Sequence, residues 1–293
     1  MTIYVGIDGS EGADHALRWA IREADLRSTS VTAVVAWDLL NQRWATSDRS
    51  FSSTYGEEDA LRALDTWVVG TVGADAATAV GRRAVCDLPW RALVEVSKGA
   101  ELLVVGARGS GGFLGLRVGS VSERCLHVAQ CPVAVIHAQS VEPAEEHIVV
   151  GVDGSTTSGR SLQWALDEAR ARKATVCAIA AWDAGSVMAY PYAGGALDPR
   201  VFEDAAEEIL RTALAAADTH DVAVEPRLAP GGAASAILEA ADDATLVVVG
   251  TRGLSGVKSW LLGSTSRQVV HHAVCPVVVI PTENAPDNKG SVS

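Results

Sequence analysis

Cysteine, basic charge and long apolar runs are all scarce in this sequence, and each scarcity excludes a class of protein. The five cysteines are an odd number, with no C-x-x-C pair and no Cys/His spacing suited to zinc. We therefore expect neither a disulfide framework nor a zinc site. We interpret the cysteines as small core residues in a reducing compartment, with redox sensing by two of them as the alternative. They are Cys86, Cys125, Cys131, Cys177 and Cys275.

No apolar run reaches the roughly 18 residues of a membrane span, and the N-terminus enters a strand pattern directly. We expect a soluble, cytoplasmic protein with no membrane span. Lys and Arg number 24 against 36 Asp and Glu, which gives a formal net charge of −12. Such a chain is not expected to hold nucleic acid or an anionic membrane surface. Its ligand can still be anionic where helix dipoles and a few arginines act at close range.

What the sequence does contain is a long internal repeat. The segment Gly106-Ala-Arg-Gly109, nine residues and Gly119-Ser120 returns as Gly250-Thr-Arg-Gly253, nine residues and Gly263-Ser264. Ile3–Ser10 likewise returns as Ile148–Ser155. A period of this length matches a whole domain, so the chain is predicted to hold two copies of one fold. We expect domains at 1–138 and 147–281, a polar linker at 139–146 and a frayed tail at 282–293.

Within each copy, apolar strand patterns alternate with helical ones. In the first half, strands are expected at 2–7, 31–37, 79–85, 102–105 and 133–137, and helices at 13–26, 58–72, 89–97 and 120–129. The second half repeats this order. Such alternation predicts an α/β fold with right-handed crossovers and a doubly wound, mostly parallel sheet. A ligand is then expected beyond the carboxyl ends of the strands.

The repeated glycine loops are interpreted as phosphate sites. Glycine lets the backbone approach a ligand closely, and the free N–H groups at the start of the following helix point where an anion would rest. The alternative is a glycine-rich turn with an ordinary helix cap. Ser120 and Ser264 are expected to cap the last helices, with Glu123 completing a capping box that has Arg267 in its place in the second half. We therefore expect the second site to bind more tightly.

Charged side chains flank both loops. Asp8 and Asp153 end strands before Gly-Ser and a helix, where an aspartate can accept from a ribose hydroxyl or hold magnesium, or else cap the helix. The matched Arg108 and Arg252 suit phosphate geometry, with solvated loop charges as the alternative.

Tryptophans also lie where the second strands end. Trp37 and Trp182 either flank a purine or pack in the core, and the backbone around them is the part we expect to touch the base. Trp19 and Trp164 fall on apolar helix faces and are expected to be core residues.

Two common nucleotide motifs are missing. Neither the P-loop pattern nor the dinucleotide pattern G-x-G-x-x-G fits the glycine segments. No Ser-His-Asp or Cys-His arrangement recurs in both halves, so no catalytic residue is predicted.

The residues do resemble the universal stress protein family. Its ATP-binding members carry Gly-x2-Gly-x9-Gly-Ser/Thr after the fourth strand, an Asp ending the first strand and a Cys-Pro-Val type last strand, and this chain looks like a tandem member. The resemblance implies Rossmann-like domains of five parallel strands in the order 3-2-1-4-5. It also implies ATP as the ligand, with Mg²⁺ as an optional companion, and a homodimer formed through the last strands at 133–137 and 277–280.

The resemblance and the residues together define the predicted nucleotide-binding sets. In the first half they are Gly6, Asp8, Ala36, Gly106, Arg108, Gly109, Gly119, Ser120 and Val121. In the second half they are Gly151, Asp153, Ala181, Gly250, Arg252, Gly253, Gly263, Ser264 and Thr265.

Three functions remain open at this point. The first is a nucleotide-dependent regulatory or stress-response protein that signals to an unknown protein partner. The second is a slow Mg²⁺-dependent ATPase, with Asp8 and Asp153 holding the metal, which rests on fold analogy alone. The third is a purely structural scaffold.

Overall fold

The computed structural model describes residues 1–38, 55–110, 117–137, 146–183, 198–253 and 262–282. The chain divides into two compact units, the first built mainly from residues 1–138 and the second mainly from 139–257 and 263–280. The predicted linker and tail lie almost wholly outside the described residues.

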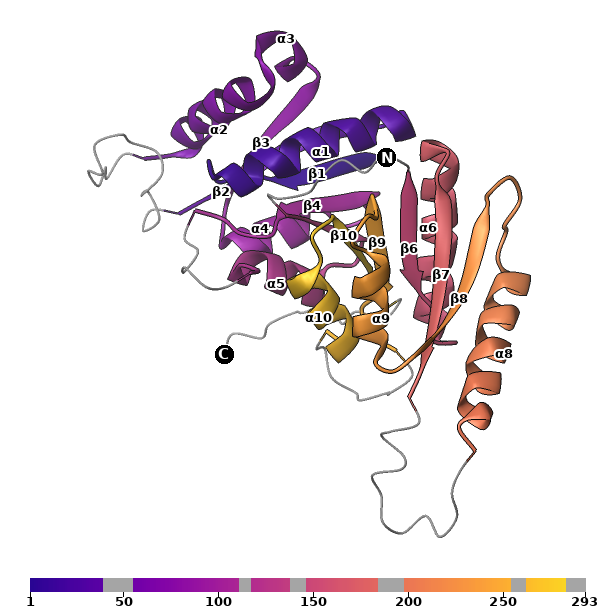
Figure 1. Cartoon of the computed structure of the whole chain (residues 1–293). Helices are drawn as coiled ribbons and strands as arrows, with labels where there is room; N and C mark the ends of the chain where they lie inside the picture. The colour runs from indigo at the N-terminus through magenta and orange to yellow at the C-terminus, as the bar shows by residue number, and fades with distance from the viewer. Residues whose placement is uncertain (39–54, 111–116, 138–145, 184–197, 254–261, 283–293) are drawn as a thin grey trace. The chain divides into compact units, whose positions relative to one another are not determined.

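Strands and helices alternate along the first unit (Figure 1). Its strands are β1 (Thr2–Gly6), β2 (Ser30–Trp37), β3 (Val80–Cys86), β4 (Leu102–Gly106) and β5 (Val133–Ile136). Its helices are α1 (Glu11–Arg27), α2 (Glu57–Val72), α3 (Ala74–Ala77), α4 (Pro89–Val96) and α5 (Ser120–Val128). The short α3 was not predicted; the other elements lie within one or two residues of their expected bounds.

The second unit repeats this order with one exception. Its strands are β6 (His147–Gly151), β7 (Thr175–Trp182), β8 (Val224–Pro230), β9 (Leu246–Gly250) and β10 (Val277–Ile280). Its helices are α6 (Thr156–Arg172), α8 (Arg200–Ala216), α9 (Ala233–Ala240) and α10 (Ser264–His272). No helix corresponding to α3 occurs in the described stretch between α8 and β8.

The strand order confirms the predicted doubly wound fold. The first unit runs β3-β2-β1-β4-β5 and the second β8-β7-β6-β9-β10, and every pair within a unit whose register is given is parallel. Right-handed crossovers then place α1 and α2 on one face of the first sheet and α4 and α5 on the other. Helices α1 and α2 pack on each other, as do α4 and α5. The central strands β4 and β9 are buried except at their last residue, a glycine, as expected for strands covered on both faces.

The strand-to-helix turns are built alike in the two units. Gly9 and Gly154 have φ of 74° and 83°, the left-handed region that glycine enters without strain. Ser10 and Ser155 then cap α1 and α6, each accepting a hydrogen bond from the backbone N–H three residues on. Each strand therefore turns sharply into its helix at the carboxyl edge of the sheet.

Each unit also buries one carboxylate on the helix that follows its first strand. Glu23 on α1 and Glu168 on α6 are almost fully buried, and each pairs with the arginine four residues on, Arg27 and Arg172. Arg27 contacts a second carboxylate, that of Glu101, at 3.2 Å. A buried carboxylate needs such a partner because desolvation strongly penalises its charge.

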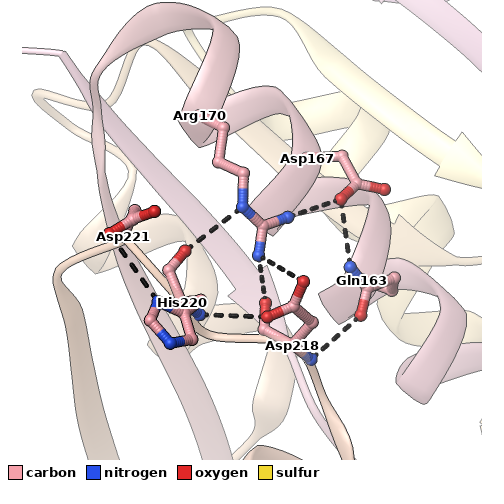
Figure 2. A network of polar contacts seen from close by, with 6 residues as sticks. All are labelled: Gln163, Asp167, Arg170, Asp218, His220 and Asp221. Carbon is pink, nitrogen blue, oxygen red and sulfur yellow. Dashed lines mark hydrogen bonds and ion pairs between the residues drawn. The ribbon is translucent and has the colours of Figure 1, made fainter.

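A polar network holds α6 to the segment that follows α8 in the second unit (Figure 2). The Arg170 guanidinium donates to Asp167 Oδ1 at 2.7 Å and to the carbonyl of His220 at 3.2 Å, and it pairs with Asp218 Oδ2 at 3.1 Å. The backbone N–H of Asp218 donates to Gln163 Oε1 at 3.2 Å. In sequence, Asp25 stands where Arg170 does, so the first unit carries the opposite charge at this position.

The interpretation of the cysteines as core residues holds for four of the five. Cys86, at the end of β3, is exposed, whereas Cys125, Cys131, Cys177 and Cys275 are buried. Burial raises the pKa of the Cys125 thiol to about 12, and the pKa of Cys275 likewise to about 12.

The tryptophan expectations are met in part. Trp19 is buried in the core as predicted, while Trp164 is only half-buried. Across the described segments, the helices are all too short or too polar to cross a bilayer.

Candidate functional site

A cavity of about 270 Å³ opens at the carboxyl edge of the second sheet. All nine residues that the sequence predicted for this half line its wall. They come from the ends of β6, β7 and β9, from the loop after β9 and from the first turn of α10. The cavity therefore lies at the switch point of the sheet, where the first and fourth strands of the unit run side by side.

The start of the loop after β9, at Gly253, lies against the strand-end aspartate Asp153. A Cβ atom built on Gly253 would lie less than 3.0 Å from the Asp153 carboxylate, and one on Gly250 less than 3.0 Å from the Thr157 side chain. Real Cβ atoms essentially never come so close, so a side chain at either position would have to displace the side chain of Asp153 or Thr157. Gly253 lets the loop backbone lie directly against the Asp153 carboxylate, and Gly250 lets the end of β9 lie against Thr157.

The N-terminus of α10 forms one wall, and here the prediction of a serine cap is wrong. The helix begins at Ser264, its N-cap is Gly263, and no side chain caps it. Likewise Gly119 is the N-cap of α5 and Ser120 its first helical residue, so Ser120 and Glu123 form no capping box. A glycine N-cap has no side chain that could accept hydrogen bonds from the first N–H groups of the helix. All of these N–H groups can therefore bind an anion, whereas a serine cap would occupy one of them.

A pair of buried serines, which were not predicted as site residues, joins the last helix of each unit to its fourth strand. Ser122 Oγ donates to the carbonyl of Gly106 at 2.7 Å, and Ser266 Oγ donates to that of Gly250 at 2.5 Å. Both serines are 4% exposed. Their signal was present as Gly-Ser-x-Ser, repeated at both helix starts, but only the first serine was considered.

The apolar part of the cavity was also missed. Ile179, Ile237 and Val249 line it together with Ala233. These residues differ in no obvious way from other core residues in the sequence, so only the fold shows that they face a cavity. An apolar wall beside a few convergent polar groups is typical of small-molecule sites.

The first unit brings its predicted residues to the same edge, with closer backbone contacts. Gly109 lies against Asp8 as Gly253 does against Asp153, since a Cβ on Gly109 would come within 3.0 Å of the carboxylate. A Cβ on Gly12 would likewise be less than 3.0 Å from the carbonyl oxygen of Arg108. The second half has Thr157 in place of Gly12. The loop after β4 thus rests directly on the start of α1.

The remaining first-unit predictions also lie at this edge. Gly6 ends β1, Ala36 is the penultimate residue of β2, and Val121 is the second residue of α5. The N–H of Gly119 donates to the carbonyl of Ala107 at 2.7 Å. Arg108 is exposed, whereas its counterpart Arg252 is half-exposed and lines the second-unit cavity.

Asp8 accepts four hydrogen bonds from two serines. Ser10 donates to Oδ1 through its N–H at 3.1 Å and its hydroxyl at 2.5 Å. Ser110 donates to Oδ2 through its N–H at 2.8 Å and its hydroxyl at 3.0 Å. Asp8 is therefore not the cap of α1 but supports the cap, Ser10. In the second unit, Asp153 Oδ1 accepts from the N–H of Ser155 at 3.0 Å.

Trp37 ends β2 beside the first site. Its ring meets Tyr55 edge-on, with centroids 6.1 Å apart and planes at 67°. Its indole Nε1 is buried and has no hydrogen-bond partner among the described residues. Burial, reinforced by the charge of Asp59, raises the pKa of the Tyr55 phenol.

No group of three or more His, Cys, Asp or Glu side chains arranged to hold a metal occurs in the ranges that the structure describes.

Comparison with protein families gives two matches along the chain. The model of the universal stress protein family matches residues 1–137 and again 145–281. A universal stress protein of Mycobacterium tuberculosis is 34% identical over 288 residues, covering 94% of this chain and 96% of that protein. One from Mycolicibacterium smegmatis is 32% identical over 291 residues, covering 95% and 96%.

Solved structures of this fold are similar as well. A universal stress protein from Archaeoglobus fulgidus has a TM-score of 0.63 at 20% identity, covering 96% of this chain and 98% of that one. A putative universal stress protein from Pseudomonas aeruginosa has a TM-score of 0.64 at 19% identity, covering 97% and 94%. At 20% and 19% identity, these similarities show a shared fold only.

Proposed function

This chain belongs to the universal stress protein family and carries two copies of its domain, and on that premise we propose that it binds an adenine nucleotide and acts as a nucleotide-dependent regulatory or stress-response protein. The observation that most supports this proposal is the second-unit cavity, which all nine predicted residues line. The proposed ligand is ATP, with Mg²⁺ carried on its phosphates, as that ion is usually bound.

Each part of the cavity suits one part of a nucleotide. The uncapped start of α10 and the backbone of the loop after β9 offer N–H groups to phosphates, and Arg252 offers a guanidinium. Asp153 offers carboxylate oxygens to ribose hydroxyls. Ile179 and Ile237 offer an apolar surface to the flat faces of a base, next to Ala181 at the end of β7.

The proposed domains are residues 1–138 and 147–281, the linker is 139–146 and the tail is 282–293. The protein works in the cytoplasm through a protein partner, and two copies pair through edge strands. Light scattering of the purified chain tests the pairing.

Isothermal titration of the purified protein with ATP tests the nucleotide proposal. We expect saturable binding, and we expect Gly253→Ala to weaken the second site at least tenfold, because its Cβ would collide with Asp153. Gly159→Ala is the matched control: Gly159 lies in α6 with nothing within 4 Å of its added Cβ, so ATP binding should be unchanged. The proposal fails if millimolar ATP, ADP and AMP all leave the wild-type protein unoccupied. Phosphate release measured alongside separates a binding protein from a slow ATPase.

A further inference from the structure

The two strand-end aspartates differ in what surrounds them, and the difference centres on Ser110. Residue 110 directly follows the second glycine of the first loop. It lies 102 positions from Asp8 in sequence, yet its N–H and its hydroxyl both donate to Oδ2 of that aspartate. The residue that follows the matching Gly253 is Leu254, which lies outside the described residues and has no hydroxyl.

The hydroxyl of Ser110 is the same kind of donor as a sugar hydroxyl. Both are neutral O–H groups, and both form their strongest hydrogen bonds with a charged acceptor such as a carboxylate. Oδ1 of Asp8 already accepts two bonds from Ser10, which is held in place as the cap of α1. Ser10 leaves the other carboxylate oxygen of Asp8, Oδ2, unoccupied. Ser110 donates two hydrogen bonds to Oδ2 and so occupies both of its lone-pair directions, which a ligand would otherwise use.

The surrounding backbone holds Ser110 in this place. The loop after β4 lies on Gly12 of α1, close enough that no side chain fits between Gly12 and the carbonyl of Arg108. Gly109 lies against the same Asp8 carboxylate. In the second unit, Thr157 takes the position of Gly12, and a Cβ on Gly250 would lie less than 3.0 Å from the side chain of that threonine.

From these contacts we propose that Ser110 is a specificity-determining residue of the first site: its hydroxyl competes with the ribose hydroxyls of a nucleotide for Asp8. The inference rests on the proposed nucleotide function. A nucleotide that enters the first site must displace the Ser110 hydroxyl from Oδ2 before its ribose gains that contact. The first site consequently binds ribonucleotides more weakly than it would with alanine at position 110.

The test isolates each site and then removes the hydroxyl. In a Gly253→Ala background, where the first site carries the binding, Ser110→Ala should tighten ATP binding about tenfold, the usual scale of one hydrogen bond to a charged group. The same substitution in a Gly109→Ala background, where the second site carries the binding, should leave the affinity unchanged. Ser110→Thr keeps a hydroxyl and should keep the weak affinity.

A second ligand separates competition for the carboxylate from simple crowding. 2′,3′-Dideoxy-ATP has no ribose hydroxyl to replace that of Ser110, so Ser110→Ala should not improve its binding. If both ligands gain equally, Ser110 acts by bulk and the inference is overturned. It is also overturned if Ser110→Ala leaves ATP binding at the first site unchanged, weaker or undetectable while the second site still binds. If neither site binds ATP in any variant, the proposed function itself is what fails.

Discussion

The two units share one strand order and one pattern of alternating helices, yet their candidate sites differ. In both, a glycine with positive φ turns the first strand into a serine-capped helix, and a glycine N-cap begins the last helix. The differences lie in residues that contact or flank these groups: Ser110 against Leu254, Gly12 against Thr157, and Glu123 against Arg267. The two units thus keep the same groups at the candidate site, while the residues next to those groups differ.

Two kinds of contact occur in both halves of the chain. The buried Glu–Arg pairs recur in both halves and involve no predicted site residue. The hydrogen bonds from Ser122 to Gly106 and from Ser266 to Gly250 also recur, and their acceptors are predicted site residues. The Glu–Arg pairs stabilise the helices, and the serine bonds fix the glycine loops, so we expect the loss of either contact to destabilise its half. The Arg170 network occurs in the second unit at a place where the first unit has Asp25.

The largest effect is expected from the shared buried pair. Arg27→Ala and Arg172→Ala each leave a buried carboxylate without its nearest cation, and each should lower the free energy of unfolding by about 3–5 kcal/mol. Urea unfolding followed by circular dichroism measures the loss. Arg62→Ala, which breaks an exposed pair with Asp59, is the control and should leave the midpoint in place. A large loss in one half with none in the other would break the equivalence of the two scaffolds.

An intermediate effect is expected where the loops rest on the helices. Gly12→Ala forces a methyl group against the carbonyl of Arg108 and should destabilise the protein by about 1–3 kcal/mol. Gly159→Ala adds the same methyl in open space on α6 and should stabilise by about 0.5–1 kcal/mol. Thermal unfolding shows whether each substitution lowers or raises the midpoint temperature. Equal shifts would show that the close approach in the first unit carries no energetic weight.

The smallest effect is expected from the Arg170 network. Its partners Asp167 and Asp218 are 61% and 66% exposed, so solvent screens the ion pairs. Arg170→Ala should lower the free energy of unfolding by less than about 1 kcal/mol, and the loss should shrink further in 1 M NaCl. Comparing wild type and variant at low and high salt measures this. A salt-independent loss would instead point to the bonds that Arg170 makes with the carbonyls of Asp218 and His220.

Much of the fold was predictable because its signals are local. Apolar runs, helical spacing and serine before a helix depend on a few neighbouring residues, and the repeat let each half check the other. The short α3 was missed because four residues carry little periodic signal. The serine caps at Ser120 and Ser264 were wrong by one position, because Gly-Ser offers two adjacent candidates for the N-cap and a pattern defines a helix end only to within one or two residues.

The sequence by itself determined the α/β class, the duplication and the glycines and aspartates that gather at the carboxyl edges, because strand ends in a parallel sheet meet at one edge whatever packs around them. Only the tertiary structure decided what those groups touch. Ser110 reaches Asp8 across 102 residues, and Gly12 receives the carbonyl of Arg108, because two loops from different parts of the chain are pressed together by the packing of α1 on β4. Such contacts depend on the distances between packed elements. A local pattern of residues does not predict these distances.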